Sequence, residues 1–336
     1  MASRRACWTA RTVQCWKWSG VPVEAVMSWP FFWAAAGAFL LEGVVGWPRR
    51  VMHPVAWVGG LIAGLEHRWN RPETSEARRR LWGVLTMLIL IGVTGGAGWA
   101  VQAVAGMWAW GGGLVVLCGA AGLAARSLFD HVRAIEGPLS LGDLPAARVA
   151  VAMIVGRDVD AMEEADIAAA ALESLAESFC DGVVAPVFWF VIGGLPGLFA
   201  YKAVNTADSM IGHMEPRWRA FGWAAARTDD AMNWIPARIA GALIALFHPQ
   251  GWRIMLRDAR KHASPNAGWT EAAMAGVLRV RLGGPVRYDG VMTYRPDFGD
   301  WAAPRAFDLR RGLRVYGLAC AVLFLLLIAG GVAWPR

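Results

Sequence analysis

Long apolar runs separated by basic loops dominate the chain. A run needs about 20 apolar residues to cross the hydrocarbon core of a bilayer. Four runs approach or reach that length: Pro30–Gly46, Leu81–Val101, Met107–Ala125 and Gly312–Trp334. The pattern therefore predicts an all-α, polytopic integral membrane protein with about four transmembrane helices.

Two further apolar stretches, Val183–Val204 and Ile235–Phe247, depart from this pattern. The second is only about 13 residues, a length typical of a buried or re-entrant segment. Helix-breaking residues interrupt the first at Pro186, Gly193, Gly194 and Pro196. We expect the first stretch to enter the bilayer and turn back as a re-entrant or interfacial segment, which brings its two polar flanks together at the cytoplasmic surface.

Composition and charge support the membrane class. The 336-residue chain is 56% hydrophobic and only 18% charged, and its mean hydropathy is +0.38. The net charge of +7 does not indicate nucleic-acid binding, because the arginines flank the apolar runs. The positive-inside rule places these loops in the cytoplasm and both termini outside. The arginines are Arg49, Arg50, Arg68, Arg71, Arg78, Arg79, Arg80, Arg126, Arg133, Arg310, Arg311 and Arg314.

The first 26 residues conflict with this topology. Four cations, Arg4, Arg5, Arg11 and Lys17, would precede the first apolar helix on the outer side. We therefore expect 1–26 to be an extension before a natural start at Met27, and we expect a chain beginning there to be functional. The remaining organisation is N-terminal membrane helices with a basic loop over 27–125, a helical cytoplasmic or interfacial catalytic region over 126–311, and a C-terminal transmembrane helix over 312–336.

A polar island lies within this apolar chain, between Tyr201 and Ile239. Charged groups near membrane depth are costly unless they are paired or form a site. Carboxylate and amide oxygens are ligands that Mg²⁺ accepts, usually together with phosphate oxygens, and lysine or arginine can hold phosphate. The alternative is a set of structural ion pairs that brace helix ends. The island contains Lys202, Asn205, Asp208, Arg227, Asp229, Asp230, Asn233 and Arg238.

Two flanking segments extend the candidate site. Asp166, Glu173 and Glu177 share one stripe of a predicted helix that points toward Asp181, although such a stripe is also typical of a solvated helix face. Farther on, a turn at Ser264–Asn266 precedes a predicted helix, whose first backbone N–H groups can bind an anion. Lys261 lies before that turn and adds positive charge.

Several familiar sites are absent from the sequence. The chain has no P-loop, no dinucleotide-binding glycine motif and no GxSxG element. Its five cysteines are scattered and lack CxxC spacing, so they indicate neither a disulfide framework nor a zinc site. Cys180 is the only cysteine beside polar residues, and a nucleophilic role for it has little support because no cation stands near it in sequence.

The motifs resemble those of the CobD/CbiB family, the membrane-bound cobalamin biosynthesis proteins called adenosylcobinamide-phosphate synthases. The similarity covers residues 40–284 and follows the family's order and spacing. It implies ATP-dependent amide formation between (R)-1-amino-2-propanol, or its O-phosphate, and the free propionate carboxyl of adenosylcobyric acid. The motifs are LFDHVRAI, AVAMIVGRDVDAM, ALESLAESFCDGVVAPVFWF, AYKAVNTADSMIGH, RAFGWAAARTDDAMNWIPARI and RKHASPNAGWTEAAMAGVLRVRLGGP.

This chain departs from the family pattern at two places. Where the family usually reads E-N-x-S-D-G, the chain has ESFCDG, so Ser178 and Cys180 replace the usual residues while Asp181 is kept. The early G-D-P of the family reads G-W-P here, with Trp47 in place of the acid. These changes suggest an altered aminoalcohol preference or a weaker activity.

The chemistry implied by the resemblance suits the polar residues. A carboxylate must be activated before an amine attacks it, and ATP does so through an acyl phosphate or an acyl adenylate, which leaves phosphoryl charge to neutralise. We expect Mg²⁺ on Asp181, Asp208, Asp229 and Asp230. We expect ATP on Lys202, Asn205, Arg227, Asn233, Arg238 and Lys261, and we take Glu177 as a base for the amine. The expected location is the inner (plasma) membrane with the site facing the cytoplasm, and association with other late enzymes of the pathway is a further expectation.

Three other functions are alternatives to the ligase. A membrane CDP-alcohol phosphotransferase needs D-G-x-x-A-R, but Pro186 stands where that arginine should be. A non-catalytic sensor or regulator derived from the same family is compatible with the two departures, although Asp208, Asp229 and Asp230 are intact. A transporter should show more complete spans and an internal repeat.

Overall fold

The computed structural model describes residues 28, 30–48, 51–288 and 290–334. The expected extension over 1–26 and the expected start at Met27 lie outside these residues. The described chain is mainly helical, as expected for the all-α class, and it adds one small antiparallel hairpin of strands that the sequence did not predict. The fold class is therefore confirmed.

The elements follow one another with short connections. The strands β1 and β2 pair in antiparallel register from Leu282↔Phe298 to Tyr288↔Val291, with an irregularity between Gly283 and Pro285. The helical elements are α2 Phe32–Val45, α3 Pro54–Trp69, α4 Glu76–Ala105, α5 Gly111–Ala120, α6 Ala125–Ser140, α7 Leu144–Val151, α8 Glu164–Phe179, η1 Cys180–Val184, α9 Ala185–Ile211, α10 Trp223–Met232, α11 Trp234–Ala245, α12 Pro249–Asp258, η2 Ala259–Lys261, α13 Ala267–Leu278 and α14 Ala306–Ala333, and the strands are β1 Leu282–Tyr288 and β2 Val291–Phe298.

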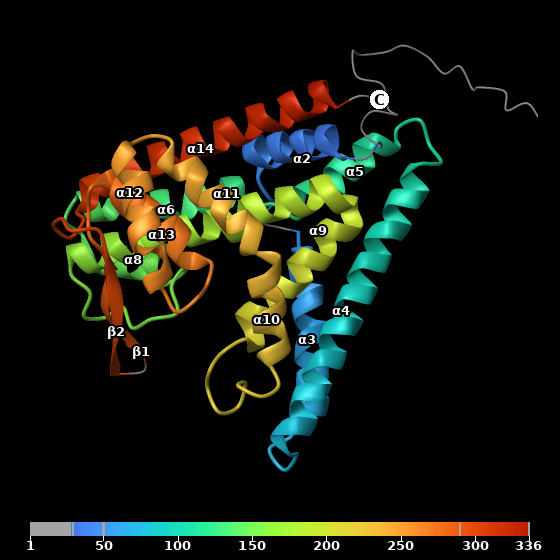
Figure 1. Ribbon diagram of the computed structural model, residues 1–336, viewed down its shortest axis with the longest axis horizontal. Helices are drawn as coiled ribbons and strands as arrows, with labels where there is room; N and C mark the ends of the chain where they lie inside the picture. Colours follow the sequence, from blue (N-terminus) through green and yellow to red (C-terminus); the bar gives the residue numbers. More distant parts are fainter. Residues whose placement is uncertain (1–27, 29, 49–50, 289, 335–336) are drawn as a thin grey trace, which may run out of the picture.

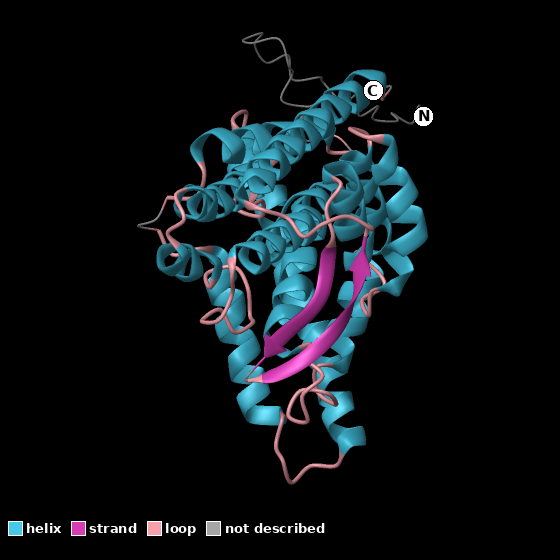
Figure 2. Ribbon diagram, turned by 90° about the vertical axis from the view of Figure 1, so that its left-hand side faces the viewer, coloured by secondary structure: helices cyan, strands magenta, loops and turns pink. Residues whose placement is uncertain are grey.

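The helices form two arms that diverge from a shared end (Figure 1). One arm holds α14, α2, α6, α8 and α13, and the other holds α3, α4, α10 and the second half of α9. The hairpin lies against the first arm, where β1 contacts α8 and β2 contacts α13 (Figure 2). The polar island sits where α9, α10 and η1 meet, between the arms.

Four helical stretches are long and apolar enough to cross a membrane: Glu76–Ala105, Gly111–Ser140, Glu164–Ile211 and Ala306–Ala333. Two of the expected spans are confirmed as the single long helices α4 and α14. The expected span Met107–Ala125 overlaps the candidate stretch Gly111–Ser140, in which α5 itself has only 10 residues, whereas the expected span Pro30–Gly46 forms α2, a shorter apolar helix of 14 residues. The helical path is interrupted between α5 and α6. There the backbone N–H of Ala124 donates to the carbonyl of Gly182 in η1.

The long stretch over 164–211 does not run straight. At Gly194 the backbone leaves the helical conformation, with φ of 60° and ψ of −153°. The groups freed by this turn find partners, because Leu195 N–H donates to Gln102 Oε1 over 3.0 Å and Phe31 N–H donates to the carbonyl of Val191 over 2.9 Å. Satisfied backbone groups are what a turn at membrane depth requires.

The turn at Gly194 makes α9 a helical hairpin. Asp181 lies 13 residues before Gly194 and Asn205 lies 11 residues after it. Each half of this hairpin is therefore roughly 16–20 Å long at a helical rise of about 1.5 Å per residue. The Nδ2 of Asn205 is nevertheless 3.4 Å from Oδ2 of Asp181, so the second half of the hairpin returns to the start of the first half. The break predicted at the glycine pair is confirmed, and its re-entry into a bilayer stays a prediction.

Pro186, which was also predicted to break the segment, does not do so. It stands in the first turn of α9, directly after the wide π turn of Cys180–Val184. A proline lacks a backbone donor and clashes with the preceding turn, and a wider turn ahead of it relieves that clash. The helix therefore continues through Pro186 and turns only at Gly194.

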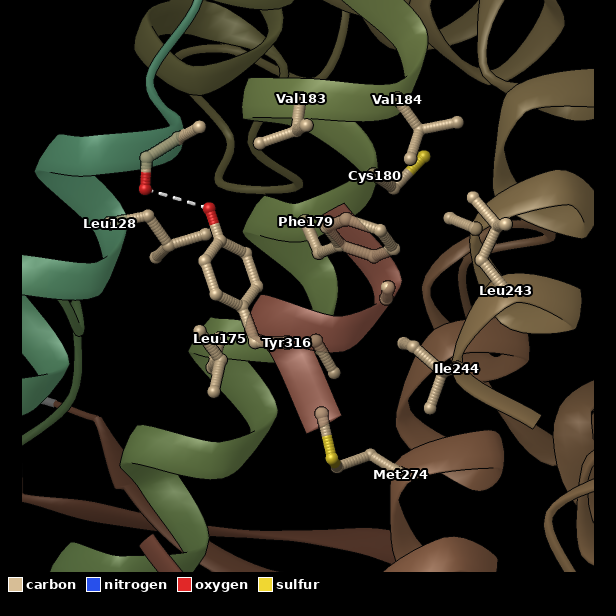
Figure 3. Close-up of a cluster of buried hydrophobic side chains, with 14 of the residues drawn as sticks. Leu128, Leu175, Phe179, Cys180, Val183, Val184, Leu243, Ile244, Met274 and Tyr316 are labelled. Atoms are coloured by element: carbon tan, nitrogen blue, oxygen red, sulfur yellow. Dashed lines mark hydrogen bonds between the residues drawn. The ribbon is translucent and has the colours of Figure 1, made fainter. Parts of the chain in front are cut away.

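A dense core around α8 holds the first arm together (Figure 3). Phe179 at the end of α8 is 1% exposed, and its ring meets that of Tyr316 edge-on at 5.5 Å. The hydroxyl of Tyr316 donates to the carbonyl of Ala125 over 2.7 Å, which joins α14 to α6. Leu243, Ile244 and Met274 close the other side. This packing fixes the end of α8, from which the π turn and Asp181 project.

The hairpin turn yields a direct test with a matched pair of glycines. An alanine at Gly194 would need a positive φ, which costs about 1–2 kcal/mol for a residue with a Cβ, and its Cβ would meet Gln102 Oε1 at 2.3 Å. A Cβ at the neighbouring Gly193 meets nothing within 4 Å. We expect Gly194→Ala to lower the thermal unfolding midpoint of the detergent-solubilised protein by a few degrees or more, while Gly193→Ala leaves it unchanged. Equal midpoints for the two variants would contradict the turn.

Candidate active site

A cavity of about 160 Å³ lies where the end of α8 and η1 meet the second half of α9, α10 and the start of α13. Its wall contains the carboxylates of five acidic residues, and amide and hydroxyl groups fill most of the remainder. The lining residues are Glu177, Cys180, Asp181, Asp208, Ala226, Asp229, Asp230, Asn233, Ser264, Asn266, Ala267 and Thr270. The structure therefore brings together the acidic residues that the sequence indicated.

The end of α8 and the π turn supply one wall of the cavity. Glu177 and Asp181 are four residues apart, so a helical path places both on one face. The π turn begins at Cys180 and brings this residue to the cavity as well. Single π turns inside helices are frequent at functional sites because they redirect side chains in this way.

Two asparagines hold the carboxylates of Asp181 and Asp229 near each other. The Nδ2 of Asn205 lies 3.4 Å from Asp181 Oδ2 and 3.4 Å from Asp229 Oδ1. The Nδ2 of Asn233 donates to Asp229 Oδ2 over 3.0 Å, and its Oδ1 accepts from the hydroxyl of Tyr201 over 3.0 Å. The amides orient the two acids and do not neutralise them.

The cavity carries an excess of negative charge. Its lining holds five carboxylates, Glu177, Asp181, Asp208, Asp229 and Asp230, and no lysine or arginine, and the cations Lys202 and Arg227 lie beside it. The Nζ of Lys202 lies 3.4 Å from Asn205 Oδ1, and the guanidinium of Arg227 pairs with Asp230 over 3.2 Å. Such an arrangement favours a divalent cation together with phosphate oxygens, because carboxylates alone repel one another in a partly buried site.

Burial acts on the acids of α10. Asp229 is 8% exposed, and its burial, followed by the neighbouring carboxylate of Asp208, raises the pKa of Asp229 to about 7. The hydrogen bonds from Asn233 and Asn205 oppose that shift. Burial also raises the pKa of Asp230, while the guanidinium of Arg227 opposes the change. A cation that binds here therefore competes with a proton on Asp229 near neutral pH.

The turn before α13 forms the opposite wall. Ser264 Oγ accepts from the backbone N–H groups of Asn266 and Ala267 over 3.2 and 3.3 Å. The Nδ2 of Asn266 donates to the carbonyl of Asp230 over 2.8 Å, which joins this turn to α10. The predicted turn is therefore part of the site. The hydroxyl oxygen of Ser264 already accepts from two of the backbone N–H groups that were expected to bind an anion.

Of the six residues expected to bind ATP, only Asn233 lines the cavity; Lys202, Asn205 and Arg227 lie beside it, and Arg238 and Lys261 are held by other partners. Arg238 donates to Asn266 Oδ1 over 2.7 Å, and its guanidinium lies between the rings of Trp234 and Trp269, at 4.5 and 4.8 Å from their centroids. Stacking and this hydrogen bond hold the arginine as a support for Asn266. Lys261 pairs with the fully buried Asp258 over 2.7 Å. The fully buried Asp258 also pairs with Arg257 over 2.7 Å, and Lys261 belongs to this ion cluster and does not line the cavity.

The three acidic residues of the stripe predicted on α8 have different roles. Asp166 caps the start of the helix, where its carboxylate accepts from the N–H of Glu163. Glu173 is 2% exposed and pairs with Arg157 over 2.6 Å and Arg295 over 2.7 Å. Only Glu177 reaches the cavity. The second arginine comes from β2, a strand that periodicity did not predict, so the pairing of Glu173 could not be foreseen.

Some residues of the site were missed in the sequence. Thr270 and Asn266 line the cavity, and Tyr201 orients Asn233 from behind it. The turn at Ser264–Asn266 pointed to Asn266, but nothing in the sequence singled out Tyr201 or Thr270. Cys180 lies 3.9 Å from Asn233 Oδ1, and no basic nitrogen is hydrogen-bonded to its thiol among the residues described, in keeping with the weak support for a nucleophile.

The two departures from the family pattern occupy different places. Cys180 lines the cavity, whereas Ser178 does not. The ring of Trp47 packs against that of His53 at a tilt of 57°, with centroids 4.7 Å apart, and its indole N–H donates to the carbonyl of Val51 over 2.8 Å. The tryptophan thus fixes the start of α3 instead of contributing a carboxylate.

The carboxylates fit an incomplete metal site. In the described part of the chain, no group of three or more His, Cys, Asp or Glu side chains is close enough to form a metal site by itself. Asp181, Asp208, Asp229 and Asp230 therefore do not form a closed cage. Mg²⁺ commonly keeps waters and takes only one or two carboxylates alongside substrate phosphates, and an open set of this kind suits that mode.

Comparison with known proteins places these observations in a family. A family model described as "CobD/Cbib protein" matches residues 35–316. A "Cobalamin biosynthesis protein CobD" of Rhodobacter capsulatus is 48% identical over 306 residues, which cover 88% of this chain and 95% of that protein. Proteins with the same description from Geobacter metallireducens and Citrobacter koseri are 44% and 38% identical, covering 86% and 90% of this chain and 93% and 97% of their own lengths. No solved structure matches the chain.

The raised pKa of Asp229 predicts how stability depends on pH. An ordinary aspartate ionises near 3.8, whereas folded Asp229 ionises at about 7. Between these values the folded protein keeps a proton that the unfolded chain has lost, so the free energy of unfolding falls as pH rises through this window. We expect a lower thermal midpoint at about pH 7.5 than at about pH 5.5 in magnesium-free buffer, and a smaller difference in Asp229→Asn. Asp160→Asn, at an exposed position, is the control. If Asp229→Asn showed the same difference in thermal midpoint between the two pH values as the unaltered protein, the assignment would be contradicted.

Proposed function

The chain belongs to the CobD/CbiB family and acts in cobalamin biosynthesis, and from this premise we propose that it is an ATP-dependent acid–amine ligase. It joins (R)-1-amino-2-propanol, or its O-phosphate, to the propionate carboxyl of adenosylcobyric acid and gives adenosylcobinamide or its phosphate. The observation that carries the proposal is the acidic cavity, in which Asp181, Asp208 and Asp229 converge from three segments.

The acidic cavity suits the activation of a carboxylate. ATP supplies the driving force by converting a carboxylate oxygen into a good leaving group, and the phosphoryl charge must be neutralised during transfer. Asp181, Asp208, Asp229 and Asp230 offer oxygen ligands for Mg²⁺. Lys202 and Arg227 offer positive charge for phosphate oxygens. The volume of about 160 Å³ is below the 300–1,000 Å³ typical of whole small-molecule sites, so the cavity accommodates phosphate groups while the nucleoside and corrinoid lie outside it.

Glu177 is placed to handle a proton of the amine. An aminoalcohol is an ammonium ion at neutral pH, and it must lose a proton before its nitrogen can attack. The carboxylate of Glu177 lines the cavity one helical turn from Asp181. The neighbouring Glu173 is held by Arg157 and Arg295, which leaves Glu177 as the carboxylate of α8 directed to the reacting groups.

The supporting residues keep this set of side chains rigid. Asn205 and Asn233 orient Asp181 and Asp229, and Arg238 supports Asn266 on the facing wall. We assign these residues positioning roles. An intact acidic set with its supporting contacts favours a catalytic protein over a regulator that has lost activity.

We place the protein in the plasma membrane with this cavity at the cytoplasmic side. ATP is available there, and the basic residues that flank the apolar helices favour that orientation. The site lies at the open end of the α9 hairpin, where an amphiphilic corrinoid could approach along the membrane surface. Association with other late enzymes of the pathway would shorten the path of a membrane-bound product.

Removal of a cavity carboxylate tests the ligase assignment. We expect Asp208→Ala and Asp229→Ala to abolish product formation, because each loses an oxygen ligand that offsets phosphoryl charge, worth several kcal/mol in the transition state. Membranes that carry the protein are incubated with adenosylcobyric acid, Mg-ATP and either amine, and the cobinamide product is measured. Asp160→Ala is the control for a carboxylate outside the cavity. Wild-type turnover in either cavity variant would remove that residue from the site, and background product from the unaltered protein with both amines would refute the ligase.

The orientation can be tested with single cysteines outside the site. Ala220 is only 3% exposed, so a thiol there is shielded, whereas Glu215 in the same loop and Ala302 before α14 are exposed. We expect Glu215→Cys and Ala302→Cys, each in a protein lacking its native thiols, to react with an impermeant maleimide only in inside-out vesicles. Labelling of either position in intact cells would place that part of the site region outside.

A further inference from the structure

A second cavity, which shares no lining residue with the acidic site, lies on the first arm. It has a volume of about 440 Å³ and runs between α2, α6 and α14. Its apolar lining includes Phe39, Val44, Phe129 and Phe324, and its polar lining includes Arg126 and Arg133. We call it the α2–α14 groove.

The α2–α14 groove changes from apolar to basic along its length. The helices α2 and α14 run antiparallel, because Phe32 lies beside Gly330 while Phe39 stacks on Phe324 with ring centroids 6.4 Å apart. The lining of α14 then continues through Cys320 to Tyr316, toward the end of the helix that carries Arg314. The arginines of α6 stand at that end. This order matches a phospholipid, whose acyl chains lie deep and whose phosphate lies at the surface.

The charges around the groove leave donors for an anion. The carboxylate of Glu42 accepts from the backbone N–H of Arg126 at 3.1 and 3.2 Å and is only 4% exposed. The guanidinium of Arg126 meets the half-exposed Asp130 at 2.9 Å. Arg133 forms no ion pair within 4.0 Å among the residues described, and the nearby carboxylate of Glu136 pairs with Arg310 over 2.7 Å. An arginine uses several N–H groups, so both side chains can still contact a phosphate.

The neighbouring surface is apolar and exposed. Leu40 and Val44 on the rim are 54% and 66% exposed, as expected where lipid covers a membrane helix. Arginines at such a depth often only extend their side chains to water. That explanation accounts for the two arginines. It does not account for a cavity between three helices whose lining contains both these arginines and aromatic side chains.

We propose that the α2–α14 groove binds one anionic glycerophospholipid, with an acyl chain along Phe39 and Phe324 and the phosphate on Arg126 and Arg133. Basic pockets between transmembrane helices bind lipid head groups in this way. The bound lipid fills the space between α2 and α14 and so supports the arm on which α8 and the π turn are built. The site is separate from the acidic cavity and does not depend on the ligase proposal.

Native mass spectrometry of the detergent-solubilised full chain tests the charge requirement. Phosphatidylglycerol and phosphatidylcholine with the same acyl chains are titrated against the protein. We expect one molecule of phosphatidylglycerol to bind in preference to phosphatidylcholine, and the Arg126→Gln/Arg133→Gln variant to lose affinity for it by roughly tenfold or more. The control is Arg68→Gln/Arg78→Gln, which removes the same charge far from the groove. Equal binding of the two lipids, or unchanged affinity in the groove variant, would overturn the proposal.

A second pair of variants tests the position of the acyl chain without a change of charge. A Cβ at Gly43, in the groove, and a Cβ at Gly317, outside it, each meet nothing within 4 Å. We expect Gly43→Leu to lose the bound lipid and Gly317→Leu to retain it, with both variants folded by size-exclusion chromatography. Glycerol phosphate, added at millimolar concentration, should not displace the lipid. Displacement by glycerol phosphate, or retention of lipid in folded Gly43→Leu, would show that no acyl chain occupies the groove.

Discussion

The rest of the structure depends on one turn of the backbone within apolar surroundings, the reversal of α9 at Gly194. An unpaired amide or carbonyl is costly where water is scarce, so a reversal is possible only where the freed groups find partners. Gln102 of α4 and the backbone of Phe31 provide them. The turn is therefore stabilised by contacts with α4 and with the residue that precedes α2. The hairpin in turn brings Asn205 back to Asp181, and without this return the polar island would have no counterpart on α8.

The acidic cavity is costly for the protein on its own. Five carboxylates line a cavity that has no lysine or arginine in its lining, and two asparagines restrain the central pair without neutralising it. A raised pKa for Asp229 is the direct expression of this cost. Sites of this kind hold strain that a ligand relieves, because a bound cation replaces both the proton and the repulsion. The supporting contacts of Arg238 and Asn266 keep the walls in place while the cavity holds this charge.

The buried core around α8 and the long apolar helices serve different physical tasks. Around α8, side chains such as Phe179 and Leu243 are nearly or fully excluded from solvent and pack as in a soluble protein. The long helices α4 and α14 instead leave many apolar side chains exposed, which is the pattern of helices that face lipid. The π turn lies between these regions. A rigid core therefore holds the residues of one wall, while the other wall returns from the membrane hairpin.

The sequence alone determined the membrane class, the break at the glycine pair and the membership of Asp181, Asp208, Asp229 and Asp230 in one polar set, because hydropathy, glycine chemistry and residue type are local properties. Tertiary structure decided which neighbours share a cavity. Glu173 and Glu177 lie on one predicted stripe, yet arginines from 157 and 295 claim the first and leave the second free. Lys261 and Arg238 carry the expected charge, yet Asp258 and Asn266 hold them behind the site. Periodicity gives the face of a helix on which a side chain lies, but the partner across that face comes from a distant part of the chain.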